Sequence, residues 1–373
     1  SRVRSASTVS SKSRLTPTIE LTPLVIEDGL YCEPVIPTMV GVFGSIAIAI
    51  VATVVIWKGS ALLERAAATL STYYGLPVAV HGAVVIAVGS SFPEFSSVVI
   101  STLLHGEFSL GVGTIVGSAI FNLLVIPALS ALSSEQLEAT RDIVHKDAQF
   151  YIISVLVLFI VFALGATYVP GGTNEAAILT PTLAVLPLAT YGVYVFLHQQ
   201  DASDHVADES IDIDPLREWG ALLLSLAVIA IGVEGLVRAA LNFGALFDTP
   251  AFLWGLTVIA AGTSLPDAFV SVRAAKNDES VTSLTNVLGS NTFNLLVAIP
   301  VGVLLAGSAT INFLAAIPTM GFLAFATLVF IVFARTHLEL TDAEAYGFLG
   351  LYALFLFWMT LESVGVIETV RGI

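Results

Sequence analysis

Two stretches of this chain place a carboxylate, hydroxyls and an amide in the same order inside apolar sequence. The first runs from Ala87 to Asn122, begins A-V-G-S-S-F-P-E and ends G-S-A-I-F-N. The second runs from Ala260 to Asn294, begins A-A-G-T-S-L-P-D and ends G-S-N-T-F-N. Because the residue types recur in order, we treat the stretches as two copies of one motif.

Each copy holds one acid and one closing amide at a matched distance. Asn122 follows Glu94 by 28 residues, and Asn294 follows Asp267 by 27. The Gly and Pro before each acid weaken a helix, and a break in a membrane helix frees carbonyls that can bind cations. A carboxylate in apolar sequence is costly without a partner, so the pattern predicts a functional ion site.

The neutral oxygens of both copies extend the predicted ligand set. Ca²⁺ takes six to eight oxygen ligands in irregular geometry, and neither copy contains the His or Cys that Zn²⁺ or copper prefers. Ser118 precedes Asn122 by four residues, as Ser290 precedes Asn294, so each pair shares a helix face. The candidate hydroxyl ligands are Ser90, Ser91, Ser118, Thr263, Ser264 and Ser290.

Charge balance indicates what two carboxylates can hold. Glu94 and Asp267 neutralise one Ca²⁺, whereas more than two Na⁺ leave excess positive charge. A full Na⁺ load and Ca²⁺ therefore exclude each other, as an exchanger requires.

Structural roles explain single members of the motif but not the doubled set. A Ser or Thr in an apolar helix usually bonds its own backbone, and the Gly-Ser pairs can also be close-packing points between helices. Two further acids in apolar spans, Glu64 and Glu234, lack the Pro and hydroxyl context. We expect each to pair with its neighbouring arginine or to face an interface. His105 reads as a span-end residue without a visible partner.

Composition predicts a polytopic membrane protein. Of 373 residues, 56% are hydrophobic and 12% charged, against about 25% charged in soluble proteins. The net charge of −15 argues against nucleic-acid binding, which needs a basic face. The single cysteine, Cys32, excludes an intrachain disulfide framework or a cysteine metal cluster.

The hydropathy pattern predicts an all-α fold of ten spans in two sets of five, since about 20 apolar residues cross a bilayer. We place the spans at about 38–70, 78–104, 109–132, 148–168, 176–198, 217–243, 250–275, 282–306, 309–335 and 343–363. The motif copies align at an offset of 172–173 residues, which indicates duplication. An odd number of spans per repeat inverts the second repeat, so its broken helices meet those of the first near the midplane.

The predicted parts are a mobile tail at 1–37, a first repeat at 38–198, an acidic linker at 199–216 and a second repeat at 217–373. By the positive-inside rule, the linker is cytoplasmic and both termini are external. Only Arg238 and Arg371 fall on the external side by this assignment, if the N-terminal tail is set aside. The tail also carries basic residues and would lie outside. The basic residues that we place in or beside cytoplasmic loops are Lys58, Arg65, Arg141, Lys146, Arg217, Arg273, Lys276 and Arg335. We read the linker as a solvated connector, because it lacks the Gly and terminal Glu of an EF-hand loop.

These motifs resemble the two alpha repeats of the sodium/calcium exchanger family, within the cation/calcium exchanger superfamily. The resemblance covers both repeats and implies Ca²⁺ coordination by Glu94 and Asp267 with oxygens of Ser90 and Thr263. It implies alternating access by sliding of spans one and six, and a multi-pass protein of the cell membrane. It also implies two sodium sites. One is formed by the Ala87 carbonyl with Ser91 and Ser118, and the other by the Ala260 carbonyl with Ser264 and Ser290. Asn122 and Asn294 would line the middle of the site, between the two.

Three departures bear on coupling. Ser90 stands where Thr is usual, Ala119 where several relatives have Asn, and Asn294 where some relatives carry Asp, which weakens the case for K⁺ cotransport. The G-N-A-x-E pattern of proton-coupled relatives is absent, so Na⁺ is the expected driving ion.

We expect a prokaryotic Na⁺/Ca²⁺ antiporter with Ca²⁺ and Na⁺ as transported ions and no other cofactor. Acidic loops with four lysines favour a salt-rich habitat.

Other functions remain open from the residues. Ca²⁺/H⁺ exchange is the nearest alternative. A cation channel is disfavoured because the acids come from repeats of one chain rather than a ring of subunits. An intramembrane enzyme with Glu94 and Asp267 as an acid–base pair is also conceivable, but no nucleophile with an adjacent His supports it.

Overall fold

The computed structural model describes most of the chain after residue 40. The described residues are 41–74, 87–134, 137–138, 146–173, 176–201, 213–336, 339–367 and 369. By its contacts the chain divides into Ser1–Thr38 and Met39–Ile373, and every described residue belongs to the second unit. The predicted tail at 1–37 lies outside the described residues, as does most of the predicted linker.

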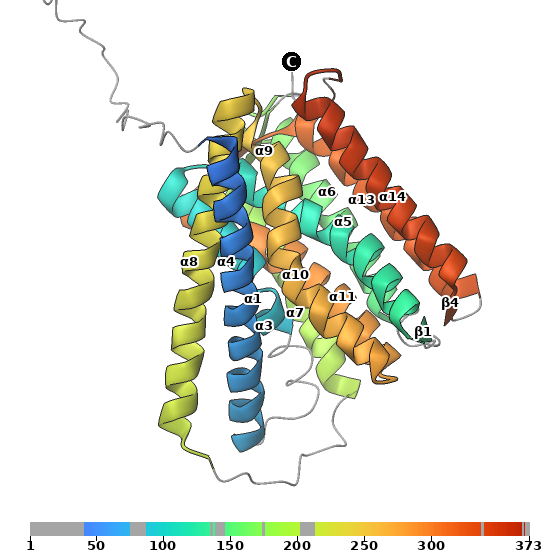
Figure 1. Ribbon diagram of the computed structural model, residues 1–373. Coiled ribbons are helices and arrows are strands. Elements are labelled where there is room, and N and C mark those ends of the chain that lie inside the picture. The colour runs from blue at the N-terminus through green and yellow to red at the C-terminus, as the bar shows by residue number, and fades with distance from the viewer. Residues whose placement is uncertain are drawn as a thin grey trace, which may run out of the picture. The chain divides into compact units, whose positions relative to one another are not determined.

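Helices make up almost all of the described chain (Figure 1). The first half contains α1 (Val42–Tyr73), α3 (Ala87–Ser90), α4 (Phe92–His105), α5 (Phe108–Ser133), α6 (Ala148–Thr167) and α7 (Pro181–Asp201). The second half contains α8 (Pro215–Phe247), α9 (Ala251–Trp254), η3 (Gly255–Ile259), α10 (Ala260–Lys276), α11 (Ser280–Phe293), η4 (Asn294–Ala298), α12 (Ile299–Ala306), α13 (Phe313–Thr336) and α14 (Asp342–Ser363).

Nine stretches of the described helices are long and apolar enough to cross a bilayer. Here α9, η3 and α10 form one continuous stretch, as do α11, η4 and α12. The remaining predicted span, 78–104, begins among residues 75–86, which lie outside the described residues, and continues through α3 and α4. The fold is an all-α polytopic membrane protein.

Two short antiparallel strand pairs join the halves. β1 (Leu137–Glu138), between α5 and α6, pairs with β4 (Glu339–Leu340), between α13 and α14. β2 (Ala176–Leu179), between α6 and α7, pairs with β3 (Ala309–Asn312), between α12 and α13. By their place in the order of elements, β1 corresponds to β3 and β2 corresponds to β4. Exchanging each strand for its counterpart therefore converts one strand pair into the other.

Helices α1 and α8 pack on each other more extensively than any other two elements, and they run in opposite directions (Figure 1). Glycine allows the close approach: a Cβ atom at Gly59 would lie 2.8 Å from Ile229 Cγ1, and one at Gly232 would lie 2.7 Å from Ile56 Cγ1. A larger residue at either position would therefore push the two helices apart.

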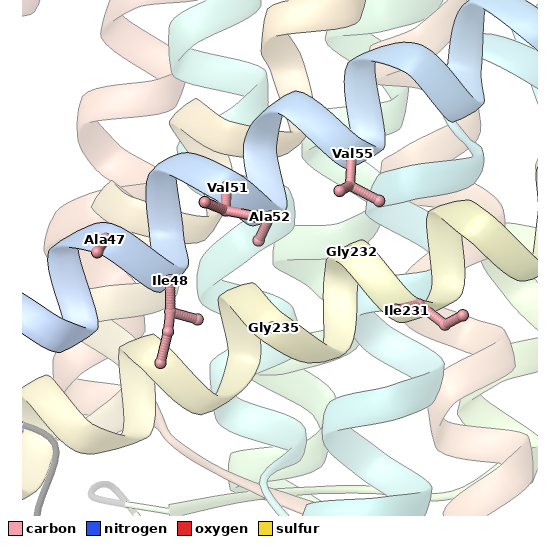
Figure 2. A pocket seen from close by; sticks show the side chains of 8 residues that line it. All are labelled: Ala47, Ile48, Val51, Ala52, Val55, Ile231, Gly232 and Gly235. Atoms are coloured by element: carbon pink, nitrogen blue, oxygen red, sulfur yellow. The ribbon is translucent and has the colours of Figure 1, made fainter.

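An apolar groove of about 350 Å³ runs along this helix pair (Figure 2). Its lining is aliphatic or glycine throughout: Ala47, Ile48, Val51, Ala52, Val55, Ile231, Gly232 and Gly235. Because no polar side chain faces the groove, it offers no ligand to an ion.

Helix α5 is buried along almost its whole length and carries the second part of the first motif. A Cβ atom at Gly113 or Gly117 would overlap the backbone carbonyl of Phe252 or Leu256. The small residues of α5 thus bring its backbone against α9 and η3, directly before the second motif.

The structure corrects three expectations. Helix α10 runs unbroken through the second motif, so only the first copy shows the predicted break. Lys58 and Arg65 lie inside α1 rather than beside a loop, because α1 is longer than a bilayer requires. The linker is shorter than 199–216, since α7 continues to Asp201 and α8 begins at Pro215.

Candidate ion-binding site

The first motif places Glu94 at the start of a helix. α3 ends at Ser90, Ser91 forms a turn, and α4 begins at Phe92 with Pro93 in its first turn. Proline suits this position because its missing N–H is not needed in the first turn. Glu94 therefore lies among the unpaired N–H groups of a helix N-terminus, which favour negative charge.

The second motif reaches a similar result without a break. Pro266 lies inside α10 and has no N–H for the carbonyl of Gly262. The π-helical turn η3 directly precedes α10, and such turns frequently occur at functional sites. Thr263 Oγ1 donates to the carbonyls of Ile259 at 3.0 Å and Ala260 at 3.3 Å. These features keep the helix continuous while changing its carbonyl pairing around Asp267.

Hydroxyls from both copies meet at Glu94. Ser264 Oγ and Ser118 Oγ are 2.8 Å apart, and they lie 3.2 and 3.4 Å from Glu94 Oε1. Three elements thus contribute to one point, namely α4, α5 and α10. The first carboxylate is surrounded by oxygens of both repeats.

A matching set of contacts surrounds Asp267. Asn122 Nδ2 lies 3.4 Å from Asp267 Oδ2. Ser90 and Ser290 lie within hydrogen-bonding reach of the same carboxylate, and their hydroxyl oxygens are 3.0 Å apart. The second acid is therefore also contacted from both copies of the motif.

Several oxygens in this region have no hydrogen-bond partner in the protein although they are buried. They are Ser91 Oγ, Glu94 Oε2, Asn122 Oδ1, Asp267 Oδ1 and Asn294 Oδ1. Buried polar atoms are costly unless they are paired, and such oxygens are the ligands that hard cations take. These oxygens fit Na⁺ and Ca²⁺, and neither copy of the motif contains a His or Cys.

The electrostatics also favour a cation. Both carboxylates have 0% solvent exposure. None of the ion pairs formed by the described residues includes Glu94 or Asp267. A pair of buried acids without a basic partner attracts positive charge strongly, because the low dielectric weakens screening.

The structure brings some of the predicted site residues into side-chain contact with one another and leaves others without a side-chain hydrogen bond. Ser118 contacts Ser264 of the other repeat, and no hydrogen bond joins Ser118 to Ser91 among the described residues. Ser91 and Asn294 are buried, and their side-chain polar atoms have no hydrogen-bond partner. Ala260 is buried at the start of α10, and Ala87 begins α3, with its side chain outside the described set.

Asn291 is a residue of this region that the motif comparison overlooked. It accepts a hydrogen bond from Asn122 Nδ2 at 3.0 Å and donates to the carbonyl of Ala119 at 3.2 Å. Asn291 and Ala119 occupy equivalent positions of the two copies, so equivalent positions touch each other. The extra amide in G-S-N-T-F-N was the signal available in the sequence.

Two of the other in-span polar residues are paired outside this site. Glu234 contacts Arg238 Nε at 2.5 Å, which confirms the expected pairing with its neighbouring arginine. The same carboxylate lies 2.9 Å from His105 Nε2, so His105 has a partner that the sequence did not show.

Comparison with known proteins places this chain in a family. The family model described as "Sodium/calcium exchanger protein" matches residues 44–198 and 217–361. The chain is 26% identical over 332 residues to the sodium/calcium exchanger MaX1 of Methanosarcina acetivorans, covering 80% of this chain and 93% of that protein. It is 27% identical over 265 residues to the inner membrane protein YrbG of Escherichia coli, covering 69% and 79%.

Solved structures show the same fold. The sodium-calcium exchanger NCX_Mj, soaked with Na⁺ and Sr²⁺, superposes with a TM-score of 0.58 at 21% identity. That match covers 84% of this chain and 98% of the other. The family model spans most of this chain, including both motif copies and the helices that position them. The chain therefore belongs to the sodium/calcium exchanger protein family.

Proposed function

We propose that this protein is a secondary antiporter that exchanges Na⁺ for Ca²⁺ across the membrane by alternating access. The observation that carries the proposal is the meeting of two fully buried carboxylates, Glu94 and Asp267, with hydroxyls and amides from both repeats. Membership of the family and the names of its relatives support the choice of ions.

The two carboxylates set the rule of exchange. One Ca²⁺ is neutralised by Glu94 and Asp267, whereas three Na⁺, the load that the family resemblance implies, leave about one net positive charge. Both loads use the same acids, so they compete for the site. Competition of this kind couples the entry of one ion to the exit of the other.

The contacts suggest how sodium is held. Ser118 and Ser264 lie together beside Glu94, and Ser90 and Ser290 lie together beside Asp267. We propose two sodium subsites, one formed by the carbonyl of Ala87 with Ser91 and Ser118, and the other by the carbonyl of Ala260 with Ser264 and Ser290. Calcium binds through Glu94 and Asp267, with oxygens of Ser90 and Thr263.

The packing of α1 and α8 supports a moving pair. These helices contact each other more extensively than either contacts the remaining elements, and small residues let their backbones approach. We propose that they slide together past α4 and α10 and so open the site to one side at a time. The exchanged strand pairs support two inverted repeats, 38–198 and 217–373, with α1 and α8 as equivalent members.

We propose that the protein lies in the cell membrane with its linker cytoplasmic and both termini external. The basic residues near the linker end carry this proposal, through the positive-inside rule. A single cysteine at Ser203, with Cys32 replaced, should resist an impermeant thiol reagent applied outside intact cells. Rapid labelling from outside would reverse the orientation.

The function is tested by calcium flux in vesicles that contain the purified protein. An outward or inward Na⁺ gradient should drive Ca²⁺ in the opposite direction, and removal of Na⁺ should stop net exchange. Flux driven by a pH gradient without Na⁺ would indicate Ca²⁺/H⁺ exchange. Flux that follows the Ca²⁺ gradient alone would indicate a channel.

A further inference from the structure

One face of α1 points toward α10, the helix that carries Asp267. A Cβ atom at Gly262 would lie 2.8 Å from Thr53 Oγ1. Trp57, one turn later on α1, stacks on Phe269 with ring centroids 4.5 Å apart. Both contacts advance along the two helices in the same direction, so α1 and α10 run parallel here.

Two polar residues continue this face of α1. Ser60 and Glu64 follow Trp57 by three and seven residues, which keeps them on its side of the helix. Ser60 is fully buried, and its Oγ has no hydrogen-bond partner. Glu64 is half-buried, and its Oε1 is buried without a partner. An unpaired carboxylate and hydroxyl inside a membrane span need a ligand to offset their burial.

Glu64 lies near the ion site but is not part of it. Its carboxylate is close enough to Asp267 for the two to repel each other. Helical side chains lean toward the helix N-terminus, which for Glu64 is the direction of Asp267. Among the described residues, however, no three His, Cys, Asp or Glu side chains gather around one point. Glu64 therefore holds a separate position beside the site.

That position lies toward the linker. We call the linker side the end of the protein at which α8 begins. The C-terminal end of α1 lies there, because Trp219 in the second turn of α8 donates to Tyr74 Oη at 3.2 Å. Glu64 lies between this end and the level at which α1 meets Phe269. An ion that moves between the linker side and Asp267 along α1 would pass Glu64.

A comparison with Glu234 shows that Glu64 is not an ordinary structural acid. Glu234, on α8, is held by Arg238 and His105. None of the ion pairs formed by the described residues includes Glu64, and Arg65 is exposed on another side of α1. Of the two sequence-based expectations for Glu64, pairing with its neighbouring arginine does not occur among these ion pairs, and facing an interface agrees with its place on the face of α1 toward α10.

We propose that Glu64 and Ser60 form a cation subsite on the linker side of the ion site, where Na⁺ or Ca²⁺ is held before it reaches Asp267 or after it leaves. The identity of the ions rests on the proposed function. The subsite itself rests on the two unpaired buried oxygens and their place on the face of α1 toward α10.

The test measures Ca²⁺ affinity in Glu64→Gln and Ser60→Ala, with Glu218→Gln as the matched control. Glu218 is a partly exposed acid in the first turn of α8 at the same end of the protein. In vesicles of defined orientation, Glu64→Gln should raise the half-saturating Ca²⁺ concentration on the linker side at least about tenfold, because a negative charge that attracts the divalent cation is lost. Ser60→Ala should raise it several-fold.

Two results would overturn the subsite. One is a half-saturating concentration in Glu64→Gln that matches the parent. The other is an equal shift in Glu218→Gln, which would indicate surface charge alone. If Glu64→Gln does not fold, as judged by gel filtration and thermal unfolding, Glu64→Asp replaces it. That variant keeps the charge but withdraws the oxygens, so several-fold weaker binding is expected and unchanged binding contradicts the proposal.

Equilibrium binding of ⁴⁵Ca²⁺ to the purified variants separates this inference from the proposed function. If the parent protein shows no Na⁺-driven Ca²⁺ flux, the antiporter proposal fails. Weaker ⁴⁵Ca²⁺ binding in Glu64→Gln but not in Glu218→Gln would still support the subsite, and equal binding in both would overturn it.

Discussion

Asp267 is a fully buried acid with one oxygen unpaired and the other only 3.4 Å from an amide nitrogen. We predict that Asp267→Asn abolishes Ca²⁺ exchange while the protein still folds. Removing one partner from a buried charge pair costs several kcal/mol, here about 3–5 kcal/mol of Ca²⁺ binding, which is more than a hundredfold in affinity. Equilibrium binding of ⁴⁵Ca²⁺ to the purified variant checks the loss.

Asp147→Asn is the matched control, because Asp147 is also buried but pairs with His198 Nε2 at 3.0 Å, away from the motifs. It should keep Ca²⁺ binding, and parental exchange by Asp267→Asn would remove that acid from the site.

At the scale of residues, the sequence predicted the two acids and their hydroxyl neighbours, since the residue types recur visibly. It could not predict that Ser118 meets Ser264, because that contact depends on how the repeats dock.

Helices α1 and α8 are the elements proposed to move as one body, and disulfides between engineered cysteines can test this. Ala52 Cβ lies 3.1 Å from a Cβ built at Gly235, near disulfide range. A cross-link there joins α1 to α8 and should leave at least half of the Na⁺-driven Ca²⁺ flux. A cross-link between Thr53 and Gly262 joins α1 to α10, and it should reduce flux at least tenfold until reductant is added.

Both cysteine pairs are made with Cys32 replaced, and the reduced forms serve as their own controls. Equal inhibition by both cross-links would contradict sliding of a rigid α1–α8 pair.

Among the elements, the length of the apolar stretches predicted the spans well, because the thickness of a bilayer fixes that length. The π-helical turns η3 and η4 had no sequence signal, and Pro266 was accommodated inside α10 instead of breaking it. Local helix weakness was outweighed there by packing against α5.

The arrangement of the whole molecule follows from duplication more than from any single contact. The repeat offset predicted two halves, and the strand pairs β1–β4 and β2–β3 join them in a mutually exchanged way that the sequence did not indicate. Strands of two to four residues carry too little pattern to detect. The salt-rich habitat stays a prediction from composition. The net charge of the two ion loads, however, has a direct consequence for transport.

We predict that exchange is electrogenic. With Glu94 and Asp267 ionised, the Ca²⁺-loaded site is near neutral, and three Na⁺ leave about one net positive charge. One charge that crosses the membrane potential gains or loses about 2.3 kcal/mol per 100 mV. An interior-negative potential should therefore accelerate Na⁺ entry coupled to Ca²⁺ exit and slow the reverse exchange. Ca²⁺ flux from reconstituted vesicles, with a K⁺ ionophore setting the voltage, measures this directly. Flux that ignores voltage would indicate two Na⁺ per Ca²⁺, and then the two carboxylates would be neutralised equally by either load.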